Sequence, residues 1–306
     1  MTAVAAPARR LPAVRIRTAG DAVPLSARKQ LARAIAVFVC VLSLGLAFEL
    51  TIMSTFQQRA AQQRLFDRFR KELATGVAPI GPADHDGKAL SLGAPVAYLE
   101  VPSIGLRQVV VEGTTSGNLT SAPGHRRDTP LPGQAGVSLV AGRLSGFGGP
   151  FARIHQLKPG AKVHVTTGQG AFDYRVIDVR RGGDPQPPPF KTGSGRLILA
   201  TADGHAFVPS GVLWVDADLN VPAVGGPGGR PSPRALPPNE QLMSSDTTTL
   251  WALAFWLQAL LLAVVAAIWA WHRWNRAKTW VVFTPALLFV GLAASGEAAK
   301  LLPNLL

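Results

Sequence analysis

Few residues of this 306-residue chain could act as a nucleophile, and no accessible cysteine is among them. The single cysteine, Cys40, lies within a long apolar stretch. Thr201, Asp203 and His205 occupy alternate positions, and a Thr-His-Asp set of this kind could activate the threonine hydroxyl. The interpretation that we favour is structural: Thr201 faces a β-core, and Asp203 begins a turn with Gly204. Spacing alone therefore assigns no catalytic residue.

The histidines do not follow a metal-binding pattern. His125 lies in a Pro-Gly loop, where we expect a turn residue and keep open a contribution to a binding cleft, as for His205. His155 and His164 are scattered along the same region. A zinc site needs several Cys, His or carboxylate ligands close together, and neither cysteines nor paired carboxylates accompany these histidines. The sequence predicts neither a metal nor a cofactor.

Residues 95–220 have the pattern of a β domain. Short runs of β-forming residues between glycines and prolines predict strands at Val96–Val101, Gln108–Glu112, Val137–Ala141, Lys162–Thr167, Phe172–Arg180, Arg196–Thr201 and Val212–Leu219. Regular short strands favour a barrel or a sandwich. A segment of about 125 residues is long enough for one β-core.

Five groups of motifs follow one another in this region. They are Leu99-Glu-Val-Pro-Ser-Ile-Gly-Leu106 with Val109-Val-Val-Glu-Gly113, Pro123-Gly-His-Arg126 with Thr129-Pro-Leu-Pro-Gly133, Val140-Ala-Gly-Arg143 with Gly148-Gly-Pro-Phe-Ala152, Leu157-Lys-Pro-Gly160, and Leu197-Ile-Leu-Ala-Thr-Ala202. In this order they resemble the sortase family, with features of classes D and E. The resemblance implies a closed, mainly β barrel of about eight strands. It also implies transpeptidation: a Cys thiolate attacks the Thr-Gly amide of a Leu-Pro-x-Thr-Gly-like signal, while a His and an Arg assist.

All three catalytic positions depart from the family when they are carried over to this chain. The His position is Arg143, the Cys position is Ala202, and the Arg position falls near Gly211. Alanine has no reactive atom, so we expect a degenerate sortase domain without catalysis. Arg143 could bind a carboxylate or peptide carbonyl in the cleft, or it could be a solvated side chain; both stay open. Thr201 is a further possible cleft residue.

Three apolar stretches predict transmembrane helices at 34–55, 250–271 and 280–296, since a membrane helix needs about 20 apolar residues. The net charge is +13. Basic residues precede the first stretch and fill the 272–278 loop, which by the positive-inside rule places both in the cytoplasm. This distribution argues against a nucleic-acid partner. It predicts a multi-pass plasma-membrane protein with a cytoplasmic N-terminus and an extracytoplasmic β domain.

The other segments connect these parts. We expect a disordered basic cytoplasmic tail at 1–30, a juxtamembrane helix and linker at 56–94, and a Pro/Gly-rich linker at 221–248. Glu49 lies inside the first stretch, where an acidic residue indicates either function or a side chain that reaches the headgroups. Lys300 is its possible partner.

These observations predict a membrane-anchored extracytoplasmic sortase-like protein that acts as a binding or assembly module at the cell envelope. The Ala, Arg and Pro bias suggests an actinobacterial host. Its expected partner is another envelope or membrane protein, or an extended peptide segment. Two alternatives stay open: an active transpeptidase or hydrolase with an unorthodox residue set, and a structural subunit of a larger membrane complex.

Overall fold

The computed structural model describes residues 26–306 except 190 and 275, and the chain forms two units, Met1–Val41 and Leu42–Leu306. The predicted basic tail lies mostly outside the described residues. Helix α1 (Ala27–Phe48) is followed without a break by a π-helical turn (Glu49–Met53) and by α2 (Ser54–Ala74). No proline and only one glycine, Gly45, interrupts this run, so nothing in the sequence ends the helix before Ala74.

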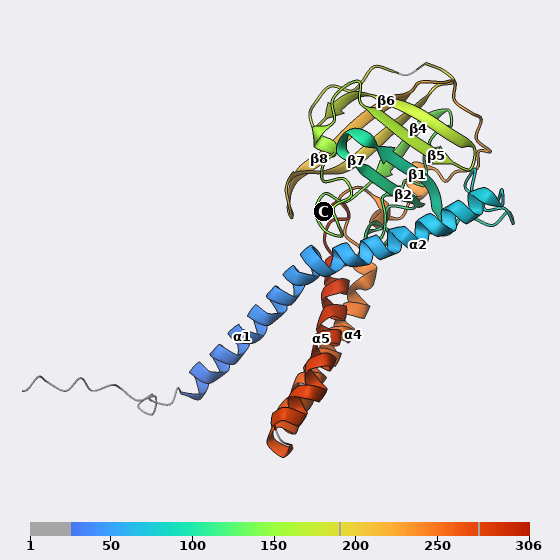
Figure 1. Cartoon of the computed structure of the whole chain (residues 1–306). Coiled ribbons are helices and arrows are strands. Elements are labelled where there is room, and N and C mark those ends of the chain that lie inside the picture. The colour runs from blue at the N-terminus through green and yellow to red at the C-terminus, as the bar shows by residue number, and fades with distance from the viewer. Residues whose placement is uncertain (1–25, 190, 275) are drawn as a thin grey trace, which may run out of the picture. The chain divides into compact units, whose positions relative to one another are not determined.

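Eight strands form a closed barrel, which confirms the predicted fold class (Figure 1). The strands are β1 (Pro95–Val101), β2 (Leu106–Glu112), β3 (Gly124–His125), β4 (Gly136–Ala141), β5 (Lys162–Thr167), β6 (Gly170–Arg180), β7 (Gly195–His205) and β8 (Val208–Leu219). Their order around the barrel is β1-β2-β3-β4-β7-β8-β6-β5. Strands β4 and β7 pair in parallel, with Ala141 opposite Ala200. The family's expected catalytic strands are therefore neighbours.

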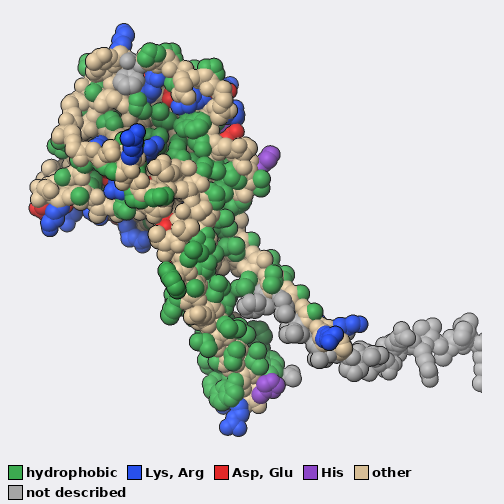
Figure 2. Space-filling model, turned by 180° about the vertical axis from the view of Figure 1, so that it is seen from behind, with side chains coloured by type: hydrophobic (Ala, Val, Ile, Leu, Met, Phe, Trp, Pro, Cys, Tyr) green, Lys and Arg blue, Asp and Glu red, His purple; other side chains and the backbone are tan. Residues whose placement is uncertain are grey.

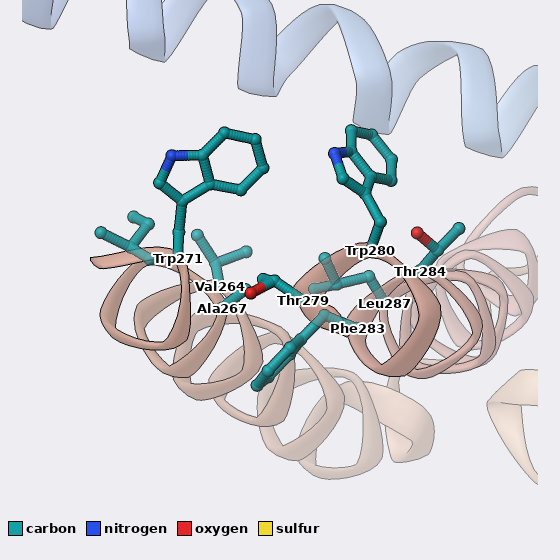
Figure 3. Close-up of a pocket in the computed structure, with 9 residues that line it drawn as sticks. Val264, Ala267, Trp271, Thr279, Trp280, Phe283, Thr284 and Leu287 are labelled. Atoms are coloured by element: carbon teal, nitrogen blue, oxygen red, sulfur yellow. The ribbon is translucent and has the colours of Figure 1, made fainter. Parts of the chain in front are cut away.

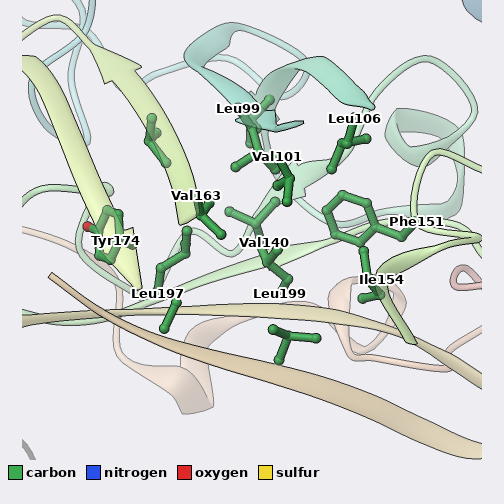
Figure 4. Packing of buried hydrophobic residues seen from close by; sticks show 14 of the residues in the cluster. Leu99, Val101, Leu106, Val140, Phe151, Ile154, Val163, Tyr174, Leu197 and Leu199 are labelled. Carbon is green, nitrogen blue, oxygen red and sulfur yellow. The ribbon is translucent and has the colours of Figure 1, made fainter. Parts of the chain in front are cut away.

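The barrel core contains side chains from every second position of the strands (Figure 4). On β7, Leu197 and Leu199 point into this core, while Ala200 and Ala202 belong to a second apolar cluster on the outer face. The period of two along a strand produces this division. Both faces of β7 are thus buried, and the small alanines leave room for other chain segments to pack against the outer face.

Short helical segments lie between the strands and, after β8, along the segment that leads to α4. They are α3 (Ser116–Leu119) and the 3-10 turns Pro102–Ile104, Ile154–Gln156, Pro233–Ala235, Pro238–Glu240 and Thr247–Thr249. The α3 helix begins after Thr115, whose hydroxyl accepts a hydrogen bond from the Asn118 N–H, the usual role of an N-cap. This short helix carries Ser116 and Leu119 toward the candidate site.

Helices α4 (Leu250–Arg273) and α5 (Arg276–Lys300) lie side by side (Figure 1). Within the described residues, three helical stretches are long and apolar enough to cross a membrane: Val39–Ala74, Thr247–Arg273 and Ala277–Lys300. Hydrophobic side chains cover the surface of α4 and α5 in the view of Figure 2. Such an all-round apolar surface is expected of helices that face lipid.

Polar side chains of α2 hold it against the barrel. The Gln58 amide donates to the Gln108 side chain at 2.8 Å, and Gln62 both accepts from the Val109 N–H at 2.7 Å and donates to the Val109 carbonyl at 3.2 Å. Phe69, which belongs to the same helix, is also buried. The α2 helix therefore packs against strands β1 and β2 instead of extending away from the barrel.

The residues expected as a linker at 221–248 also contact the barrel. The Val224 N–H donates to the Gly133 carbonyl at 2.9 Å, and the hydroxyl of Thr114 donates to the Glu240 carbonyl at 2.6 Å. Arg127 forms a bidentate ion pair with Glu240. These contacts fix the path of the segment over the barrel surface before it reaches α4.

Candidate functional site

Ala202 lies on the outer face of β7, in the second apolar cluster. It is almost completely buried and pairs with Val212 of β8. Gly211 lies one position further along the same pairing, opposite Asp203. The structure thus brings two of the three positions taken from the resemblance close together. Neither side chain can form a covalent intermediate or stabilise an anion.

Arg143 follows β4 and is the largest fully buried side chain among the described residues, with 1% of its surface exposed. Its Nε donates to the Leu119 carbonyl at 3.2 Å, and one terminal nitrogen donates to the Leu306 carbonyl at 2.8 Å. The other terminal nitrogen donates to the Ser116 carbonyl at 3.0 Å and to the Ser116 hydroxyl at 2.8 Å. The guanidinium therefore joins α3 to residues at the far end of the sequence.

Arg143 forms no ion pair with an Asp or Glu side chain of the described residues; its partners there are main-chain oxygens and the Ser116 hydroxyl. Burial lowers the pKa of Arg143 to about 10, so the side chain is still charged at neutral pH. The guanidinium also lies 4.9 Å from the ring centre of Phe147, a favourable cation–π distance. Four directed hydrogen bonds offset the desolvation of the cation. This environment fits neither an Arg143 that lies unoccupied in a binding cleft nor one that is exposed to solvent.

Leu305 and Leu306 complete the outer face beside Arg143. They are buried in one cluster with Leu119 and with the alanines of β4 and β7. The sequence reasoning did not assign these residues a role. The available signal was the pattern Leu301-Leu302-Pro303-Asn304-Leu305-Leu306, in which apolar residues continue beyond the last predicted span. A buried destination for such a run could have been expected from its hydrophobicity.

A cavity of about 660 Å³ opens next to Ala202. Its lining includes Thr201, Asp203, His205 and His155, so the structure does bring the Thr-Asp-His positions together. The Thr201 hydroxyl is buried and has no hydrogen-bond partner within the described residues. Asp203 instead accepts from Arg181 at 3.2 Å. The hydrogen-bonded chain that would activate the Thr201 hydroxyl is therefore not formed.

His125 is completely buried on β3, away from this cavity. Its Nδ1 lies 2.8 Å from a Glu112 carboxylate oxygen, and its Nε2 lies 2.9 Å from the Pro130 carbonyl oxygen. Arg230 donates to the other Glu112 oxygen at 3.2 Å. Burial by itself would raise the pKa of Glu112, but its interactions with His125 and Arg230 outweigh burial and lower that pKa. This network joins β2, β3 and the 221–248 segment.

Glu49 and Lys300 line a common cavity of about 400 Å³ near the ends of the apolar helices. Their charged groups have other partners: Gln57 donates to Glu49 at 3.0 Å, and Lys300 donates to Glu297 at 2.8 Å. The second Glu49 oxygen is buried without a hydrogen bond within the described residues. The two residues therefore share an environment without forming the ion pair suggested as possible from the sequence.

A smaller apolar groove of about 270 Å³ lies between α4 and α5 (Figure 3). Figure 3 shows the Trp271 ring on α4 and the Trp280 ring on α5, one on each wall of the groove. The walls contain almost no polar surface, which suits a lipid chain rather than a polar substrate. In the described residues, no group of three His, Cys, Asp or Glu side chains is arranged to hold a metal ion.

Residues 99–187 match the family model described as "Sortase domain". A stretch of 88 residues of this chain is 26% identical to Sortase D of Bacillus subtilis (strain 168), a match that covers 29% of this chain and 43% of that relative. The match thus spans less than half of the curated relative. Residues 99–187 of this chain are thus similar to a sortase domain.

Two solved structures are among those similar to this chain. A Clostridium perfringens Sortase D5 transpeptidase is 18% identical with a TM-score of 0.44, and the match covers 53% of this chain and 99% of that chain. Sortase E from Streptomyces avermitilis is 25% identical with a TM-score of 0.37, covering 49% and 99% respectively.

Proposed function

We propose that this protein is a catalytically inactive sortase-like module, anchored in the plasma membrane, that binds or assembles other components of the cell envelope. One observation carries the proposal: the only cysteine of the chain is Cys40 in α1, and the position expected for the nucleophile is the buried Ala202. Arg143 supports it, because a guanidinium remains protonated at neutral pH and cannot serve as the general acid that a His would be.

The first test of this proposal is a turnover assay. The purified full chain in detergent micelles is expected neither to cleave nor to transfer a Leu-Pro-x-Thr-Gly peptide, because no thiol can form the thioacyl bond. Ala202→Cys alone is also expected to be inactive, since Arg143 holds the position expected for the His and Gly211 the position expected for the Arg. Product formation by mass spectrometry above the no-enzyme background, abolished by Thr201→Ala, would instead establish the active alternative.

The second test concerns the membrane topology of the module. We expect the barrel outside the cytoplasmic membrane and the α4–α5 connection inside, because the basic residues gather on the side that remains cytoplasmic. In a Cys40→Ala background, an impermeant maleimide should label Ser232→Cys in intact cells. Ala277→Cys should be labelled only after permeabilisation. The reverse labelling pattern would invert the topology and remove the extracytoplasmic assignment.

A further inference from the structure

The residues that cover the outer face of β4 and β7 come from the far end of this same chain. Asn304, Leu305 and Leu306 are each at most 3% exposed. Leu305 and Leu306 pack in the cluster that contains Ala141, Ala200 and Ala202. Residues 304–306, which follow α5, are thus buried as deeply as the barrel core.

Hydrogen bonds to main-chain carbonyls of this segment hold it against the barrel. The Leu144 N–H donates to the Leu305 carbonyl at 2.8 Å, and the Arg143 guanidinium donates to the Leu306 carbonyl at 2.8 Å. The carbonyls of Leu305 and Leu306 thus accept hydrogen bonds from two successive residues after β4. The Leu306 N–H donates to the Pro303 carbonyl at 3.0 Å, so residues 303–306 form a turn. This turn presents the two carbonyls to Leu144 and Arg143.

Asn304 supplies the specific contacts. Its side-chain amide donates to the Thr114 carbonyl and to the Gln241 carbonyl, both at 2.8 Å, and its N–H donates to the Ser244 carbonyl at 2.9 Å. Thr114 precedes α3, whereas Gln241 and Ser244 lie shortly before α4. The segment is therefore recognised on one side by the barrel and on the other by the approach to α4.

We propose that residues 302–306 are an internal ligand of the sortase-like cleft. They bind Arg143 and cover the outer face of β4 and β7. A peptide from another molecule can bind there only after this segment has dissociated from the barrel. The inference rests on the proposed binding function and deepens it by naming the occupant of the cleft. A competing peptide would need the same chemistry: apolar side chains for the alanine-lined face, preceded by a residue with an amide donor.

The connection to α5 explains why the internal segment would prevail over a free peptide. α5 ends at Lys300, so at most two residues separate it from the 302–306 segment. Short tethers give effective concentrations of about 1 mM. A free peptide that binds the emptied site with a Kd of about 10 μM would then bind the full chain about 100-fold more weakly. The 660 Å³ cavity, lined by Leu144 and Ala202, leaves room for a longer peptide to begin to enter beside the occupied site.

Peptide binding tests the proposal directly. The probe is a fluorescent Leu-Leu-Pro-Asn-Leu-Leu peptide, measured by anisotropy against the full chain and against a chain that ends at Leu301, both in detergent micelles. The shortened chain is expected to bind the probe at least about 100-fold more tightly than the full chain. A scrambled peptide of the same composition is the matched control and should not bind. Equal binding by both chains, or none by a folded shortened chain, would overturn the proposal.

A second measurement keeps the proposal testable if the shortened chain does not fold. In the Cys40→Ala background, Leu305→Cys should react with a soluble maleimide at least tenfold more slowly than the exposed Ser232→Cys. Millimolar probe peptide should remove that protection, whereas the scrambled peptide should not. Rapid labelling of Leu305→Cys without peptide would overturn the internal ligand. It would leave the proposed lack of catalysis untouched, since turnover assays decide that separately.

Discussion

Arg143→Met is expected to destabilise the barrel by about 3–5 kcal/mol. Methionine fills a similar volume but donates no hydrogen bond. The carbonyls of Ser116, Leu119 and Leu306, which accept from the guanidinium, would lose their partner inside a buried site. Each unsatisfied acceptor costs about 1–3 kcal/mol. Release of the desolvated cation offsets part of this loss, in keeping with the lowered pKa of Arg143.

Thermal unfolding of the full chain in micelles measures this effect. A loss of 3–5 kcal/mol corresponds to a decrease in Tm of roughly 6–20 °C for a domain of this size. Arg153→Met is the matched control, because Arg153 is exposed and surface substitutions usually change stability by less than about 0.5 kcal/mol. If the two variants have the same Tm, the guanidinium does not contribute to stability, and apolar contacts alone hold the outer face.

The barrel was predictable because its strands have clear periodicity, but two features were hidden. The two-residue strand β3 (Gly124–His125) has no periodicity of its own; it exists through parallel pairing with β2 and antiparallel pairing with β4. The predicted ends at Thr201 and Val212 were too short, because β7 and β8 continue through polar residues toward a bulge near Asp203 and Gly204. Pairing with a partner strand overrides weak local β-propensity there.

The site itself depends on contacts between residues distant in the sequence, and no local pattern contains them. Arg143 was expected at or near a surface because arginines are rarely buried. Its burial requires the Leu306 carbonyl, which lies 163 residues away. The position of Ala202 followed from the sequence, since the motif around it is local. The residues that cover Ala202 could not be predicted, because Leu305 and Leu306 belong to no motif.

His125 illustrates a signal that was present in the sequence. Glu112 follows three valines on a predicted strand, and an acidic residue within such a strand needs a partner if it is buried. His125 and Arg230 are those partners. The buried glutamate, more than the Pro-Gly loop around His125, indicated that this histidine would be structural.

Glu112→Gln is expected to lower the stability of the barrel by about 3–5 kcal/mol at neutral pH, because it leaves Arg230 without its buried counter-charge and replaces the carboxylate that contacts His125. The loss should shrink in acid. The pKa of Glu112 is lowered in the folded state from its ordinary 4.5, so its contribution is complete above pH 4.5 and disappears as the pH falls through the lower folded-state pKa. Chemical denaturation of both proteins at pH 7 and near pH 3 measures this.

Glu100→Gln is the matched control for this pH dependence. Glu100 is partly exposed and lies 3.4 Å from Arg107 across the β1–β2 turn, and surface ion pairs of this kind contribute about 0–1 kcal/mol. Glu100→Gln should therefore leave the free energy of unfolding at pH 7 nearly unchanged. The Glu112→Gln deficit, in contrast, should be large at pH 7 and small near pH 3. A deficit of equal size at both pH values would mean that the amide disturbs packing, and that the charge of Glu112 does not stabilise the junction of β2, β3 and the 221–248 segment.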